Sequence, residues 1–80
     1  MAGKDAGNDT DRYVVPNKER GGWDVVKEGH KRASAHTERK PEAIDRARTI
    51  VTNEGGGEIR IANKDGQFVD GQQIKGPKQA

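Results

Sequence analysis

The chain has 80 residues and no cysteine, and its charged residues (35%) outnumber its hydrophobic ones (29%). This length allows one small domain, and the absence of cysteine excludes a disulfide framework, a cysteine-based zinc site and a thiolate nucleophile. No apolar run is long enough to span a membrane, and the first ten residues lack the apolar stretch of a secretory signal peptide. We therefore expect a cytoplasmic protein without membrane contact.

Both ends of the chain are polar and contain no large apolar residue after Met1. Such segments bury too little surface to offset the entropy lost on ordering. We predict disordered tails at residues 1–10 and 76–80, on either side of a single domain at residues 11–75.

The first half of this domain has the pattern of short strands. Arg12–Val15 is β-branched and aromatic, which is typical of a strand, and Pro16 closes that strand or confines it to an edge. The turn residues Asn17–Gly22 lead into Trp23–Lys27, which alternates, so the two segments are predicted to form an antiparallel hairpin. Lys31–Thr37 is expected to add a third, short and polar strand.

A helix is predicted at Pro41–Asn53, because proline suits the first helical turn and Gly55–Gly57 supplies a left-handed stop. Ion pairs are expected on its exposed side, Glu42 with Arg46 and Asp45 with Arg48, at spacings that stabilise helices. The apolar positions i, i+1, i+4, i+7 and i+8 form its buried face: Ala43, Ile44, Ala47, Ile50 and Val51.

Two further strands are predicted after the helix. Glu58–Ala62 alternates, Asn63–Gly66 is a hairpin turn with glycine where positive φ is needed, and Gln67–Val69 pairs back. The element order β-β-(β)-α-β-β predicts an α+β fold, a small antiparallel sheet with one helix packed across one face.

Strand alternation divides the predicted sheet residues between two faces. Eleven residues are expected in the core: Tyr13, Val15, Trp23, Val25, Ile44, Ala47, Ile50, Val51, Ile59, Ile61 and Phe68. Five are expected on the second face: Val14, Asp24, Val26, Arg60 and Ala62.

Several motifs of the chain together resemble a known family. These are Tyr13-Val14-Val15-Pro16, Gly22-Trp23-Asp24-Val25, Glu42-Ala43-Ile44 with Ala47-Arg48, and Glu58-Ile59 through Asp65-Gly66. Over residues 12–75 the sequence is similar to the small bacterial domain of unknown function 2188 family. The resemblance implies the fold and a bacterial or phage origin. It implies no activity and no functional residues, because the shared positions have the character of core and turn residues.

Catalytic or cofactor chemistry is not indicated by the residues themselves. His30 and His36 are six positions apart, too far for shared ligation on a strand, and Ser34 has no nucleophile-elbow context. Gly55–Gly57 follows a helix, whereas phosphate-binding glycine loops precede one. We predict no enzymatic activity, no metal or cofactor, and no small-molecule substrate.

Two kinds of macromolecular partner remain open. A protein partner or a second copy of the chain is expected on the second face, at Val14, Val26 and Arg60, because so small a core leaves stability to be gained by association. Two scattered surface valines are the alternative interpretation. Nucleic acid is the other hypothesis, since residues 27–40 concentrate the basic excess of a chain whose net charge is only +2. Its contacts would be Lys27, Lys31, Arg32, Arg39 and Lys40.

Overall fold

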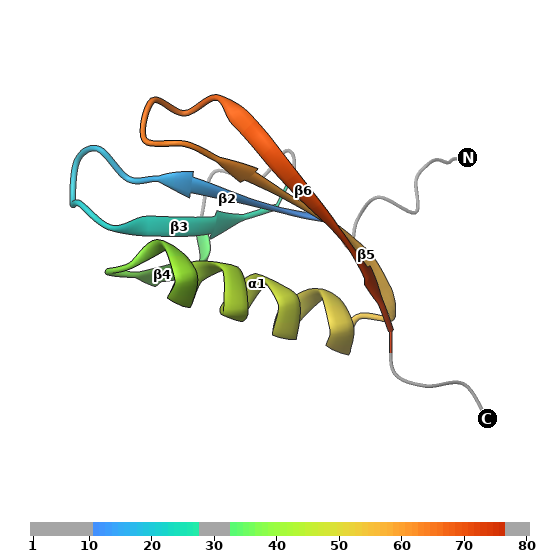
Figure 1. Cartoon of the computed structure of the whole chain (residues 1–80). Coiled ribbons are helices and arrows are strands. Elements are labelled where there is room, and N and C mark those ends of the chain that lie inside the picture. The colour runs from blue at the N-terminus through green and yellow to red at the C-terminus, as the bar shows by residue number, and fades with distance from the viewer. Residues whose placement is uncertain (1–10, 28–32, 77–80) are drawn as a thin grey trace, which may run out of the picture.

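The computed structural model describes residues 11–27 and 33–76. It contains strands β2 (Arg12–Pro16), β3 (Trp23–Val26) and β4 (Ala33–Thr37), then helix α1 (Lys40–Asn53), then strands β5 (Gly56–Ala62) and β6 (Phe68–Lys75). The strands form one sheet in the order β4-β3-β2-β5-β6, and α1 packs across one of its faces (Figure 1). The predicted α+β class is confirmed, including the third strand. The predicted tails lie outside the described residues, apart from Gly76.

One strand pair runs differently from the prediction. The sheet is mixed, because β2 and β5 at its centre are parallel, while the other three neighbouring pairs are antiparallel. The reason is the helical crossover: α1 carries the chain back to the end of the sheet from which β4 started, so β5 runs in the direction of β4 and β2. Helix and hairpins alone did not reveal which strand β5 would join.

The core lies between α1 and the sheet face that we call the inner face. Ala43, Ala47 and Val51 recur every four residues along α1 and are fully buried against this face. Trp23, Ile44 and Ile50 are partly buried and pack against the edge of the core. The buried sheet residues of this core are Val14, Val25, Ile59 and Ile61.

A charged side chain is also buried on the inner face. Arg12 is 4% exposed, and its Nη2 donates to Oε2 of Glu54 at 3.0 Å, just beyond the end of α1. Its Nη1 donates to the carbonyl of Asp11, whose own carboxylate accepts the backbone N–H of Glu58 at 2.8 Å. These contacts tie the start of β2 to the end of the helix and to β5.

Three predicted core residues are wrong. Tyr13 and Val15 alternate with the buried Arg12 and Val14, so they lie on the opposite face, and Phe68 is 46% exposed. The alternation was read one residue out of phase in β2, which moves every side chain to the other face. Ala62 is fully buried but lies on the second face, as predicted: it alternates with Ile61 and pairs with Phe68, whose ring meets that of Tyr13.

Candidate functional site

The second face of the sheet, which we call the outer face, is the candidate interaction surface. Among residues 11–27 and 33–76, no helix or loop packs over it as α1 packs over the inner face (Figure 1). Of the three residues predicted for it, Val26 and Arg60 are there, since both are register partners of Tyr13. Val14 is not: it pairs with Val25 and is fully buried beneath α1, so its prediction as a partner contact is wrong.

Apolar and aromatic side chains run across the outer face. Tyr13 lies at its centre between Val26 on β3 and Arg60 on β5, and Val15 is two residues further along β2. The ring of Phe68 meets that of Tyr13 at a centroid distance of 5.4 Å and an interplanar angle of 57°. A tilted arrangement is favoured between aromatic rings, and the Phe68 side of the pair is exposed.

A shallow hollow adjoins these rings. Its volume is about 360 Å³, and Gly71, which contributes no side chain, forms part of its lining. Across it, Nη1 of Arg60 lies 3.9 Å from Oε1 of Glu58, and both side chains are largely exposed. An exposed pair at this distance contributes little to stability, so both charges are available to a ligand. The lining residues are Glu58, Arg60, Phe68, Val69, Asp70 and Gly71.

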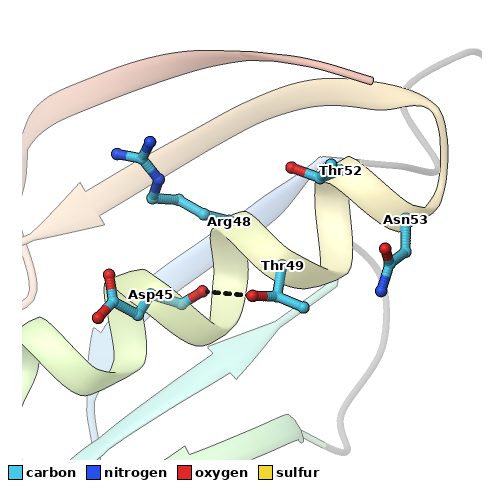
Figure 2. Close-up of a pocket in the computed structure, with 5 residues that line it drawn as sticks. All are labelled: Asp45, Arg48, Thr49, Thr52 and Asn53. Carbon is cyan, nitrogen blue, oxygen red and sulfur yellow. Dashed lines mark hydrogen bonds between the residues drawn. The ribbon is translucent and has the colours of Figure 1, made fainter. Parts of the chain in front are cut away.

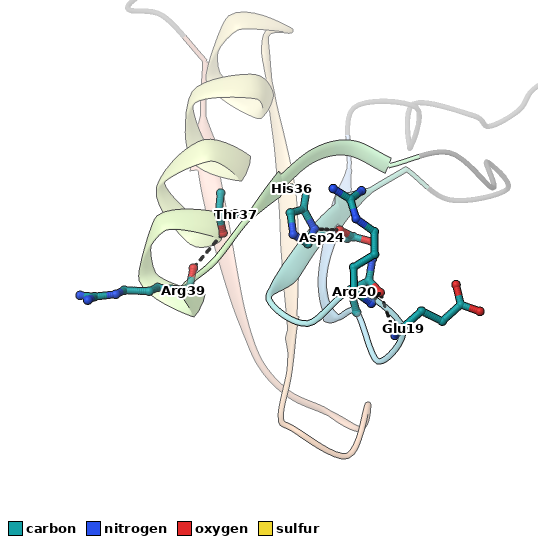
Figure 3. Close-up of polar contacts among 7 residues, drawn as sticks. Glu19, Arg20, Asp24, His36, Thr37 and Arg39 are labelled. Carbon is teal, nitrogen blue, oxygen red and sulfur yellow. Dashed lines mark hydrogen bonds and ion pairs between the residues drawn. The ribbon is translucent and has the colours of Figure 1, made fainter.

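A histidine–carboxylate pair lies at the other side of the outer face. His36 on β4 is the register partner of Asp24 on β3, and its Nδ1 is 2.6 Å from Oδ1 of Asp24 (Figure 3). The second carboxylate oxygen accepts a bond from Nδ2 of Asn17 at 3.0 Å. Because all three side chains are partly buried, this network fixes the β2–β3 turn to the edge strand. Only the strand register brings Asp24 and His36 together, so the spacing of the two histidines gave no signal for it.

The basic stretch is divided by the strand pair that contains it. Lys27 follows the end of β3, whereas Arg39 and Lys40 follow β4, which runs back antiparallel to the opposite end. Lys40 is further engaged, because its Nζ lies 5.1 Å from the centroid of the Trp23 ring. His30 and the two other predicted contacts, Lys31 and Arg32, lie outside the described residues.

A second, larger groove runs along α1. It has a volume of about 520 Å³ and is lined by Asp45, Arg48, Thr49, Thr52 and Asn53 (Figure 2). Within the described part of the chain, the predicted ion pairs of Glu42 with Arg46 and Asp45 with Arg48 do not form. Exposed helical pairs contribute only tenths of a kcal/mol, and Nη1 of Arg48 instead donates to Oε1 of Gln72 on β6 at 3.2 Å.

The described residues contain no group of three or more His, Cys, Asp or Glu side chains placed to hold a metal ion. His36 and Asp24 contact each other, and the amide of Asn17 donates to the same carboxylate. No helix in this part of the chain has the length and apolar character needed to cross a membrane.

Comparison with known proteins gives one finding. The search of curated proteins returned no match, and neither did the search of solved structures. A family model described as "Uncharacterized protein conserved in bacteria (DUF2188)" matches residues 12–72, which include all the described elements except the end of β6. The resemblance noted in the sequence is therefore confirmed, and the chain belongs to this bacterial family.

Proposed function

We propose that this chain is a non-enzymatic binding module of the bacterial cytoplasm that docks a protein through the outer face of its sheet. The occupant is another protein or a second copy of the chain. The observation that supports this is the row of Tyr13, Val15, Val26 and Phe68 on a face that no described element covers. The cytoplasmic location is supported by the absence of cysteine.

The chemistry of this face suits a protein surface. An interface of this kind combines an apolar, aromatic centre with a charged rim, and here Arg60 and Glu58 lie beside the Tyr13–Phe68 pair. Aromatic and arginine side chains are also the residues that most often dominate binding energy. We expect Tyr13, Phe68 and Arg60 to contribute most of the affinity.

Site-specific photo-crosslinking in cells tests the proposal. A crosslinking amino acid at Arg60, on the outer face, is expected to capture a protein or a second copy of the chain. The same amino acid at Arg46, an exposed residue of α1 that does not line its groove, is the matched control. The crosslink at position 60 should weaken when Val26→Lys is added. Equal capture from both positions, or capture that Val26→Lys leaves unchanged, would contradict outer-face docking.

Single-stranded nucleic acid is the second candidate, and one observation favours it. Bases stack on exposed aromatic rings while nearby cations contact the phosphates, and Arg60 is the register partner of Tyr13 on this face. The basic residues 27–40 proposed from sequence would add to the contact. Titration of labelled oligonucleotides at two salt concentrations tests it. Binding that falls with salt and with Phe68→Ser supports this candidate, and no binding at low salt eliminates it.

A further inference from the structure

The two edges of the sheet differ in how open they are. β4 has five residues, and a register shift against β3 interrupts its pairing. β6 has eight residues; its pairing with β5 also shifts, between Ile61 and Ala62, but the four residues Gly71–Ile74 pair with Gly57–Arg60 in regular register. Bulges and short lengths protect a strand edge from pairing with another chain. β6 is therefore the edge better able to accept a further strand.

The hydrogen bonding of Gly71 indicates which groups this edge presents. Its backbone N–H donates to Oδ1 of the neighbouring Asp70 at 2.8 Å. In an antiparallel pair, every second residue directs its N–H and C=O away from its partner strand. We infer that Gly71 and Gln73 direct theirs toward the open edge.

The groove along α1 lies beside this edge on the inner side of the sheet. Gln72 is the register partner of the buried Ile59, so its side chain is on the inner face, where Arg48 donates to it at 3.2 Å. Arg48 therefore extends its positive charge from the helix over β6. Among the described residues it has no acidic partner within 4.0 Å.

We propose that two copies of the chain pair through their β6 strands, antiparallel about a two-fold axis at Gly71, and that Arg48 of each copy binds Asp70 of the other. This arrangement places Asp70 of the second copy directly opposite Gln72, with Cβ atoms about 5 Å apart. To reach the Arg48 guanidinium that already contacts Gln72, the Asp70 carboxylate releases the Gly71 N–H that it binds within its own chain, and that N–H donates to the facing Gly71 carbonyl instead. The two-fold axis makes every such contact twice.

The position of the axis follows from the faces and charges of β6. Inner-face residues must oppose inner-face residues, which restricts the axis to a residue position rather than a midpoint between two. An axis at Asp70 would set two carboxylates opposite each other, which is destabilising. An axis at Gln72 would oppose Asp70 with the partly buried Ile74. An axis at Gly71 avoids both pairings and places Asp70 of one copy opposite the side-chain amide of Gln72 of the other.

The match between Arg48 and Asp70 is the reason to expect a second copy instead of an unrelated strand. Each copy supplies an exposed cation, Arg48, beside Gln72 and an exposed anion, Asp70, two positions before Gln72 on the same strand. A strand from another protein would need the same spacing to satisfy both charges. The edge interface shares Asp70 and Gly71 with the lining of the outer-face hollow, whereas Val26 lies three strands away on β3, so the two proposals can be tested separately.

Sedimentation velocity over a range of protein concentrations tests the pairing with two charge reversals. Arg48→Asp alone sets two acidic side chains against each other at each contact between the copies, and Asp70→Arg alone sets two basic ones against each other. Each variant is therefore expected to weaken the dimer about tenfold or more, since each change counts twice. A one-to-one mixture of the two variants restores both opposite-charge contacts in a heterodimer. The mixture should therefore dimerise near the wild-type concentration.

Two further variants separate this edge from a defect in folding. A Cβ at Gly71 would meet nothing closer than 3.5 Å, so Gly71→Lys fits the monomer, yet it opposes two like charges at the axis. Arg46→Asp reverses an exposed helix charge outside the groove and should leave the dimer unchanged. Circular dichroism confirms that each variant is folded.

Three results would overturn the pairing. The first is a wild-type chain that remains monomeric up to its solubility limit. The second is a dimer that Arg48→Asp and Gly71→Lys leave unchanged. The third is a mixture of the two charge reversals that stays monomeric while the wild type dimerises. A dimer that Val26→Lys weakens and these variants do not would instead support docking through the outer face.

Discussion

The two faces of one sheet differ sharply in how their side chains are used. Val14 and Val25 on the inner face are fully buried under α1, whereas Tyr13 and Val26, their neighbours in the same two strands, are only partly buried on the outer face. Both faces have apolar residues, so composition does not distinguish them. What distinguishes them is the helix, which covers one face and leaves the other uncovered among the described residues.

The largest loss of stability is expected when a charge is introduced on the inner face, and the same charge on the outer face is its control. Val14→Lys places an ammonium group where no water reaches, at a cost of about 4 kcal/mol or more, which is comparable to the stability of a small domain. We expect it to unfold the chain. Val26→Lys, on the outer face of the neighbouring strand, should cost no more than about 1 kcal/mol.

Far-UV circular dichroism and thermal melting measure both variants. A folded Val14→Lys protein with the wild-type melting temperature would mean that α1 does not cover this face. Equal losses in both variants would mean that the outer face is also buried.

The next largest effect is expected where the turn passes under His36. Gly22 has φ +77°, and a Cβ there would overlap the carbonyl oxygen of Thr37. Gly22→Ala combines backbone strain with this overlap, so we expect a loss of about 2–3 kcal/mol. Gly66→Ala is the matched control, because Gly66 has φ +89° but open space around it, and strain alone should cost about 1 kcal/mol. Urea denaturation of both variants gives the difference, and equal losses would argue against the close packing of β4 on this turn.

The hydrogen bond between His36 and Asp24 should have a smaller effect. His36→Phe keeps a ring over Gly22 but removes the bond to the carboxylate, and we expect a loss of about 1 kcal/mol. A double-mutant cycle with Asp24→Ala isolates the contact. A coupling free energy of zero would show that the pair does not stabilise the fold.

The smallest change in the free energy of unfolding is expected when a valine at the exposed start of β6 is truncated. Val69 is 60% exposed, so Val69→Ala should change the free energy of unfolding by less than about 0.5 kcal/mol. Val51→Ala removes the same atoms from the fully buried face of α1 and should cost about 2 kcal/mol. Chemical denaturation compares the two, and a similar loss at Val69 would show that the monomer itself buries this residue.

The elements of the fold were readable from local patterns in the sequence. The helix begins one residue before the predicted Pro41 and ends at the predicted Asn53, and each predicted strand is present. β6 extends to Lys75, six residues beyond its predicted end, because Gly71, Gln72 and Gln73 carry no strand signal of their own. They form a strand because β5 supplies the pairing partner.

The candidate sites were less readable than the elements. Val26 and Arg60 were assigned to the correct face, but Val14 was not, since four residues of β2 alternate equally well in either phase. The contacts of Asp24 with His36 and of Arg48 with Gln72 join residues 12 and 24 positions apart. No spacing rule within one element predicts such pairs.

The sequence alone therefore determined the helix, the turns, the family and the α+β class, because periodicity, proline and glycine act over a few neighbouring residues. Only the tertiary structure decided that β5 joins β2 in parallel, which face α1 covers, and which edge remains open. These choices depend on burying the largest apolar surface between elements distant in the chain, and that quantity exists only once the elements have packed.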